Sequence, residues 1–196
     1  RCGALAKAQE VLEQLRVRDV VSWSALIAGY AQEGQGREAL KCLTRMQSEG
    51  LTPDSITFIL ILKACSSIGL IENGEEIHEK LLRRGLLEND IVLSTALVDM
   101  YAKCGALAKA HLVHDESNVR NIVSWNALIS GYAQWGQGRE AMNCFKQMQL
   151  EGIPPNVITY VCGLRACGSL RNIEMGQELH YEVTRKGLER DALVGG

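Results

Sequence analysis

The stretch GYAQEGQGREA at Gly29–Ala39 returns as GYAQWGQGREA at Gly131–Ala141, 102 residues further along the chain. The same spacing separates two copies of CGALAKA, at Cys2–Ala8 and Cys104–Ala110. Self-similarity at a fixed period is typical of a repeat architecture, in which each unit packs only against its neighbours. We therefore expect an elongated stack whose function lies along a surface that all the units build.

The 102-residue period divides into three units of 35, 36 and 31 residues, which we call standard, long and short. The start of the chain, RCGALAKA, matches the middle of a short unit, so we expect one domain that is a fragment of a longer array. In order, the expected units are 1–19 (the tail of a short unit), 20–54 (standard), 55–90 (long), 91–121 (short), 122–156 (standard), 157–191 (long) and 192–196 (the stub of the next).

Each unit carries the apolar spacing of two short helices. In the first standard unit, Trp23, Leu26 and Tyr30 fall at i, i+3 and i+7, which is one apolar face of a helix. Gly34 interrupts this helix, and a second apolar face follows within residues 39–46. No segment shows the sustained alternation of a strand. The sequence therefore predicts an all-α fold, a right-handed α-solenoid of stacked helix-turn-helix repeats with about ten helices.

The composition argues against several classes of protein. No apolar run approaches the ~18–20 residues that a membrane-spanning helix needs. The net charge of −2 argues against crude electrostatic binding of nucleic acid. Six of the seven cysteines recur with the 102-residue period, which favours packing as free thiols over metal or disulfide chemistry. No C-x-x-C spacing occurs, so we expect neither a metal site nor a cofactor.

Two families of helical hairpins compete for these units. Tetratricopeptide repeats run 34 residues and place a small glycine where this chain has Ile27. The units instead resemble pentatricopeptide repeats, because VVSWSALIAGY at Val20–Tyr30 and GLTPD at Gly50–Asp54 look like that family's first helix and closing loop. ILKAC at Ile61–Cys65 looks like its long variant, and ALVDMYAKCG at Ala96–Gly105 like its short one. The alternating lengths resemble the plant PLS-type subclass, which cycles through standard, long and short repeats.

This resemblance implies single-stranded RNA as the partner, with one base per repeat read by two or three side chains. The fifth residue of a unit, on its first helix, and the last residue, in its closing loop, would face one base edge. The second residue would pack on the face of the base. Carried over residue by residue, the base-reading pairs are Ser24 with Asp54, Thr95 with Asn121, and Asn126 with Asn156. The base-packing residues are Val21, Ile56, Val92, Val123 and Ile158.

The long units depart from this pattern. Their fifth residues, Ile59 and Val161, cannot hydrogen-bond a base edge, whereas their last residues, Asp90 and Asp191, stay polar. We therefore expect the long units to discriminate poorly and to act more as spacers. For every polar candidate the alternative role is to cap or solvate a helix N-terminus, and for a closing Asp or Asn the two roles are compatible.

No catalytic site is expected. Members of the resembled subclass often end in a cytidine deaminase domain, which needs H-x-E followed by P-C-x-x-C. His180-Tyr181-Glu182 matches the first half, but no cysteine follows it. His111 and His114 lie three residues apart on an expected helix without an assured third ligand, so we interpret them as a solvated helix face rather than a metal site.

Two functions remain open at this point. The first is sequence-dependent binding of single-stranded RNA, which the resemblance places in plant organelle RNA processing or C-to-U editing, in a mitochondrion or chloroplast and alongside other processing proteins. The rival is a protein-binding scaffold, which the acidic net charge and the apolar Ile59 and Val161 favour. Acidic residues concentrate on the second helices. That distribution either leaves the first-helix face mildly positive or merely gives solubility.

Overall fold

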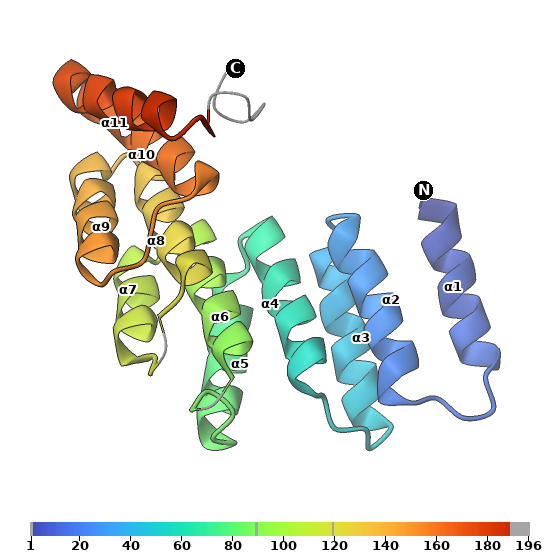
Figure 1. Cartoon of the computed structure of the whole chain (residues 1–196). Helices are drawn as coiled ribbons and strands as arrows, with labels where there is room; N and C mark the ends of the chain where they lie inside the picture. The colour runs from blue at the N-terminus through green and yellow to red at the C-terminus, as the bar shows by residue number, and fades with distance from the viewer. Residues whose placement is uncertain (1, 89, 119, 189–196) are drawn as a thin grey trace.

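Short helices follow one another along an elongated, curved stack (Figure 1). The computed structural model describes residues 2–88, 90–118 and 120–188, and within them it contains eleven helices and no strand. The predicted all-α fold is confirmed, whereas Asp191 and the stub at 192–196 lie outside the described residues. The helices are α1 Cys2–Gln14, α2 Val20–Gln32, α3 Gly36–Ser48, α4 Ser55–Ile68, α5 Ile71–Arg83, α6 Ile91–Lys103, α7 Leu107–Glu116, α8 Ile122–Gln134, α9 Gly138–Leu150, α10 Val157–Leu170 and α11 Ile173–Arg185.

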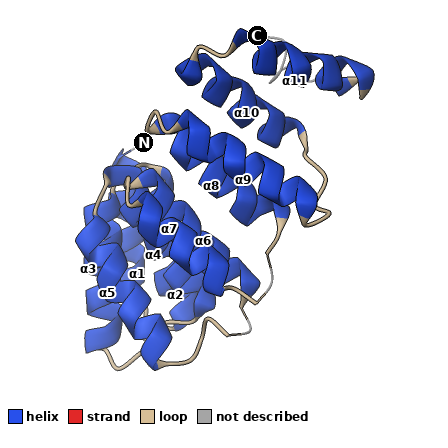
Figure 2. Cartoon of the chain, turned by 90° about the vertical axis from the view of Figure 1, so that its left-hand side faces the viewer, coloured by secondary structure: helices blue, strands red, loops and turns tan. Residues whose placement is uncertain are grey.

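The helices form two layers (Figures 1 and 2). The first helices of the hairpins, α2, α4, α6, α8 and α10, pack side by side in one continuous row. Each second helix packs on its own first helix, and α3, α5, α7 and α9 also pack on the first helix of the following hairpin. Equivalent residues of successive first helices are therefore neighbours on the side of that row that faces away from the second helices.

Buried aromatic side chains anchor the two layers to each other. Trp23, Phe58, Trp125 and Tyr160 occupy the same place in their helices, the fourth residue of α2, α4, α8 and α10, and each is at most 2% exposed. An aromatic side chain buries about 150–250 Å², so it dominates the local packing energy. These four residues belong to a single apolar cluster that runs through the whole stack.

The cysteines pack as the period suggested. The six whose side chains are described are free thiols, and five of them are buried. Burial raises the pKa of Cys65 and of Cys144 to about 12, so both stay neutral at physiological pH. The described residues contain no cluster of three or more metal-ligating side chains, and none of the described helices has the length and hydropathy to cross a bilayer.

The two CGALAKA copies fold differently at their starts. Helix α1 begins at Cys2, whereas the second copy turns at Cys104 and Gly105 before α7 begins at Leu107. In the second copy the backbone N–H groups of Gly105 and Ala106 donate to carbonyl oxygens of α6, and Gly105 adopts a φ of 82°. The turn therefore depends on the preceding helix as well as on the local sequence.

His114 corrects one expectation from the sequence. It does not lie on a solvated helix face: it is fully buried, with its ring centroid 4.3 Å from that of Trp125. Leu107, Ala110 and His114 fall at i, i+3 and i+7, so they share the buried face of α7. Neither ring nitrogen of His114 has a hydrogen-bond partner within the described part of the chain.

Replacing His114 by leucine should stabilise the fold, because Leu12 fills the equivalent buried place in the first copy. Burial lowers the pKa of His114 from 6.5 to about 4, so the folded chain keeps the ring neutral while the unfolded chain protonates it. The unfolded state gains that proton first, so stability falls as the pH drops from 6.5 towards 4. We expect His114→Leu to add about 1–3 kcal/mol at pH 7.

The gap between variant and parent should widen by about 2 kcal/mol between pH 7 and pH 5. Urea denaturation of both proteins at the two pH values measures this difference. If the variant and the parent have the same free energy of unfolding at each pH, the imidazole of His114 is not buried and unpaired.

Candidate nucleic-acid interface

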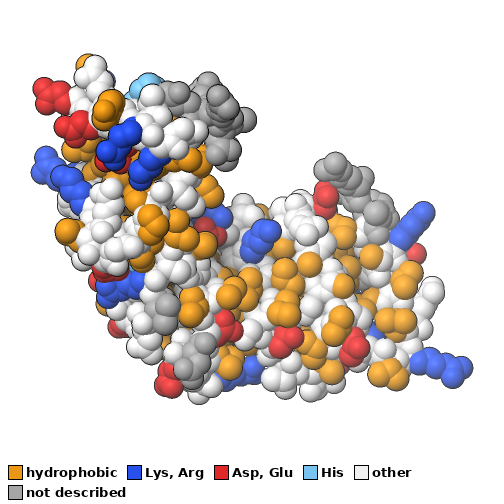
Figure 3. All heavy atoms as spheres, viewed as in Figure 1, with side chains coloured by type: hydrophobic (Ala, Val, Ile, Leu, Met, Phe, Trp, Pro, Cys, Tyr) orange, Lys and Arg blue, Asp and Glu red, His pale blue; other side chains and the backbone are white. Residues whose placement is uncertain are grey.

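Five exposed aliphatic side chains recur at one place in successive units. They are the second residues of the first helices, and each is 50% to 74% exposed. Exposed apolar side chains that recur at one repeat position are a candidate interaction surface, since exposed apolar patches mark interaction sites. Figure 3 shows apolar side chains in orange recurring over α2, α4 and α6 on the face turned to the viewer. The row comprises Val21, Ile56, Val92, Val123 and Ile158.

The first polar pair is joined through a third residue. The hydroxyl of Ser24 lies 2.8 Å from the hydroxyl of Thr57. The Thr57 hydroxyl donates to Oδ1 of Asp54 at 2.6 Å. The same Oδ1 accepts the backbone N–H of Thr57 at 2.8 Å, which caps α4. The structure therefore places Ser24 and Asp54 in one hydrogen-bonded group at the start of the next first helix.

The other two pairs touch directly. Nδ2 of Asn121 donates to the hydroxyl of Thr95 at 3.2 Å, and Nδ2 of Asn126 donates to Oδ1 of Asn156 at 3.2 Å. Thr159 completes the second group, because its hydroxyl lies 2.7 Å from Oδ1 of Asn126 and 2.9 Å from Oδ1 of Asn156. The fold thus brings together the two members of every predicted polar pair.

Each closing residue also caps a helix. Asp54, Asp90, Asn121 and Asn156 accept a backbone N–H from the first turn of α4, α6, α8 and α10. Such caps contribute about 1 kcal/mol each. A cap uses one oxygen of the Asp or Asn side chain. The second carboxylate oxygen or the amide nitrogen stays at the helix end, where it can still bond a ligand.

A shallow groove of about 290 Å³ lies between α8 and α10. Val123 and Ile158, from successive units, line it together with the Asn126–Asn156 pair. Asp99 also lines the groove, and its carboxylate pairs with Lys103 at 2.7 Å. Apolar walls beside two amides suit a flat group that has apolar faces and a hydrogen-bonding edge.

The long units offer no such pair. Ile59 is partly buried against the core, and Val161 is partly buried as well. The carboxylate of Asp90 caps α6 by accepting the N–H of Leu93 at 3.0 Å. Asp191, the last residue of the second long unit, lies outside the described residues. The described part of the long units therefore keeps the apolar wall but provides no polar reader on its first helix.

Positive charge on this face is sparse. Lys63 and Arg165 are exposed ninth residues of the long units, seven residues beyond Ile56 and Ile158 and so on the same helix face. The ninth residue of α6 is Asp99, which Lys103 neutralises. Attraction for a phosphate backbone is therefore weak, and a ligand must be held mainly by packing and by the polar pairs.

Two residues that the sequence analysis missed connect the members of two polar pairs. Thr57 and Thr159 are fully buried, and each bonds both members of its pair. A hydroxyl three residues after a closing Asp or Asn is the spacing of a reciprocal helix cap, and it was visible in the sequence. Leu93 takes this place after Asp90, in keeping with the plainer cap of α6.

Comparison with known proteins identifies the family. The model of the PPR repeat family matches residues 18–67 and 120–169, and the PPR repeat model matches residues 56–86. The chain belongs to the PPR repeat family. At least 84% of this chain aligns with each of the two Arabidopsis thaliana relatives described next. The chain spans only 24% of the length of one, At1g11290, and 18% of the other, At3g02330.

Two such relatives are the chloroplastic pentatricopeptide repeat-containing protein At1g11290, 39% identical over 99% of this chain, and the mitochondrial At3g02330, 39% identical over 84% of it. The crystal structure of PPR10 from maize superimposes with a TM-score of 0.76 and 26% identity, covering 99% of this PPR chain and 29% of PPR10. PPR10 in complex with an 18-nt psaJ RNA element matches with a TM-score of 0.73 and 21% identity, over 87% of this chain and 26% of that one.

Thr159→Val should loosen the Asn126–Asn156 pair while it preserves the shape of the buried side chain. The change removes a hydroxyl that lies within hydrogen-bond distance of two amide oxygens and accepts the backbone N–H of Asn156. We therefore expect the free energy of unfolding to fall by about 1–2 kcal/mol. Thr44→Val is the matched control, because the Thr44 hydroxyl is exposed and bonds only within α3. Its effect should stay within about 0.5 kcal/mol. Equal losses in urea denaturation would show that the Thr159 hydroxyl is not a structural link.

Proposed function

We propose that this PPR array binds single-stranded RNA in a sequence-dependent manner, with one nucleotide on each repeat. The observation that carries the proposal is the groove between α8 and α10, where two exposed aliphatic side chains flank a hydrogen-bonded polar pair. A base placed there would pack its faces against Val123 and Ile158 and turn its edge to Asn126 and Asn156. PPR10 in complex with an RNA element supports this, since it shares the fold.

The base preferred by each polar pair is carried over from the resemblance to pentatricopeptide repeats. In that family a hydroxyl with Asp favours guanine, a hydroxyl with Asn favours adenine, and two Asn residues favour a pyrimidine. Ser24 with Asp54 would then read guanine, Thr95 with Asn121 adenine, and Asn126 with Asn156 a pyrimidine. Each pair keeps polar atoms that can meet a base edge beyond those used in the helix caps.

The preferred RNA is therefore G-N-A-Y-N, where N is any base and Y a pyrimidine, with the RNA running 5′ to 3′ along the chain. The two unspecified bases fall on the long units, whose fifth residues, Ile59 and Val161, are apolar. The first helices begin 35, 36, 31 and 35 residues apart, which supports a PLS-type array. Chloroplastic and mitochondrial relatives support a role in plant organelle RNA processing or C-to-U editing.

A protein-binding scaffold is the second candidate. The sparse positive charge of the first-helix face and its row of exposed aliphatic residues favour it. A peptide-binding surface, however, gives no reason for three polar pairs at one repeat position, each fixed by hydrogen bonds. Selection from random RNA pools at two salt concentrations separates the candidates, because recovery of one motif at both requires base-specific contacts.

Asn126→Ser should change the fourth base of the selected motif from a pyrimidine to adenine. The replacement gives the second standard unit a hydroxyl with an amide, the combination of Thr95 with Asn121. The free-energy difference between binding a pyrimidine and binding adenine at the fourth base should change by roughly 1–3 kcal/mol. The preferences at the first and third bases should stay the same. Because Asn126 is only 8% exposed and bonds Thr159, the variant should lose about 1 kcal/mol of stability and remain folded.

Asn143→Ser makes the same chemical change on the second helix α9, away from the groove, and should leave the motif unaltered. A folded Asn126→Ser variant that still selects a pyrimidine would remove Asn126 from the base-reading residues. Failure of the parent chain to enrich any RNA motif would overturn the proposed function itself.

A further inference from the structure

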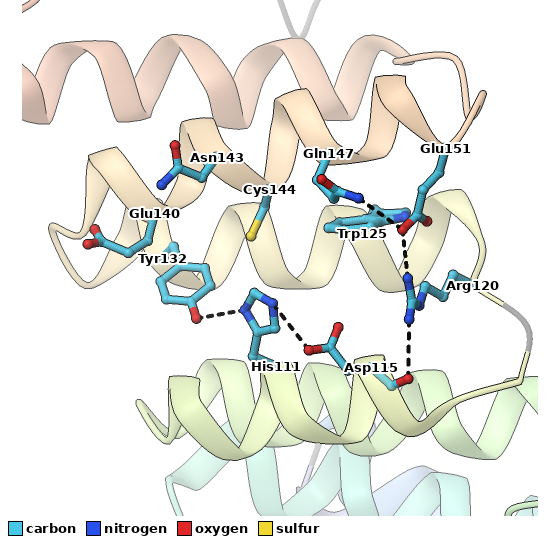
Figure 4. A pocket seen from close by; sticks show the side chains of 10 residues that line it. All are labelled: His111, Asp115, Arg120, Trp125, Tyr132, Glu140, Asn143, Cys144, Gln147 and Glu151. Carbon is cyan, nitrogen blue, oxygen red and sulfur yellow. Dashed lines mark hydrogen bonds and ion pairs between the residues drawn. The ribbon is translucent and has the colours of Figure 1, made fainter.

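A polar pocket of about 380 Å³ opens between α7, α8 and α9. Trp125 and Tyr132 line it from α8, and at 100° per residue both leave that helix on the side opposite Val123. In Figure 4 the side chains of His111 and Asp115 rise from α7 towards those of α8 and α9. The pocket is therefore separate from the first-helix face.

The equivalent junction in the first copy, between α1, α2 and α3, is filled by an arginine. Nη1 of Arg45 lies 2.9 Å from Oε1 of Glu13, and its guanidinium carbon lies 5.5 Å from the ring centroid of Trp23. A guanidinium between a carboxylate and an indole face gains both a charge-assisted hydrogen bond and a cation–π contact. A second cation, Lys41, pairs with Glu38 at 2.7 Å.

The second copy has lost both cations and kept their carboxylates. Gln147 stands where Arg45 stood and Asn143 where Lys41 stood, 102 residues later, while Asp115 and Glu140 remain. The arginine that lines the pocket, Arg120, is already paired with Glu151 at 2.6 Å. The pocket therefore holds more negative than positive charge, unlike the first junction.

Two contacts of His111 and one unpaired indole N–H characterise the rest of the pocket. His111 is hydrogen-bonded to the hydroxyl of Tyr132 at 3.0 Å, and its Nε2 lies 3.7 Å from the carboxylate of Asp115. Trp125 is 2% exposed, and its indole N–H has no hydrogen-bond partner in the described part of the chain. In the first copy the same indole N–H, on Trp23, donates to Glu49 at 3.1 Å.

We propose that this pocket is a docking site for an arginine side chain of a partner protein. The Gln147 amide, which donates to Glu151 at 3.5 Å, would be displaced. The guanidinium would then take the place that Arg45 fills in the first copy, between the Asp115 carboxylate and the Trp125 ring, with Glu140 nearby. The indole N–H of Trp125 needs an acceptor, and the backbone carbonyl beside an arginine in a peptide supplies one. The internal copy thus specifies a guanidinium carried on a peptide rather than a free cation.

The test titrates the full chain, labelled with ¹⁵N, with a blocked Gly-Arg-Gly peptide and follows the indole N–H resonances of its tryptophans. We expect the Trp125 resonance to shift with a dissociation constant on the order of 1 mM, since the carboxylates of the pocket are partly exposed. A blocked Gly-Lys-Gly peptide and guanidinium chloride at equal concentration should shift it far less. No shift with the arginine peptide, or an equal shift with guanidinium chloride, overturns the proposal.

Two reciprocal variants make the test sharper. Gln147→Arg restores the arrangement of the first copy, so it should fill the pocket from within and abolish the peptide-dependent shift at Trp125. Arg45→Gln should do the reverse and create a peptide-dependent shift at Trp23, which the parent chain lacks. Unchanged binding in a folded Gln147→Arg variant would show that the peptide binds elsewhere and overturn the assignment.

Discussion

The hydrogen bond that a backbone N–H in the first turn of each following first helix donates to the closing Asp or Asn of the preceding unit sets the geometry of the first-helix face. It begins α4, α6, α8 and α10 at the same place in each unit. It also fixes one oxygen of the closing side chain, so that the fifth residue of the preceding helix lies within bonding range of it or of its bridging threonine. The bond that caps a first helix therefore also positions a member of each predicted base-reading pair.

Duplication within the chain separates the contribution of the fold from that of individual side chains. The two junctions are built from equivalent helices, α1–α3 and α7–α9, with a buried tryptophan and carboxylates at equivalent places in the period. One holds Arg45 against Trp23, whereas the other leaves a pocket beside Trp125. The replacement of Arg45 by Gln147 is the difference that removes the guanidinium from this place, so a side chain on the second helix contributes to whether the junction can accept a ligand.

Much of this structure follows from the sequence, for physical reasons. Periodic apolar positions such as Trp23, Leu26 and Tyr30 fix the helices because only one helix face can be buried, and all three are buried. The polar pairs came from the resemblance, and their contact depends on residues about 30 positions apart. Local patterns could not show that Thr57 and Thr159 bridge them, although the capping spacing was present.

The error at His114 and the unforeseen pocket have related causes. A histidine is polar, so the sequence favoured an exposed place, whereas its register with Leu107 and Ala110 put it on the buried face of α7. The pocket depends on the combined volumes of side chains from three helices, which no single segment reveals. The different starts of the two CGALAKA copies likewise depend on a helix outside the repeated stretch.

In the proposed function, RNA lies along the second residues of the first helices. Methyl spectra of the chain, labelled at valine and isoleucine and titrated with a five-nucleotide G-N-A-Y-N RNA, test this directly. The methyl resonances of the exposed row should shift together, namely those of Val21, Ile56, Val92, Val123 and Ile158. Ile173, which is 74% exposed on the second helix α11, should not respond. Shifts at Ile173 with none along the row would contradict the claim.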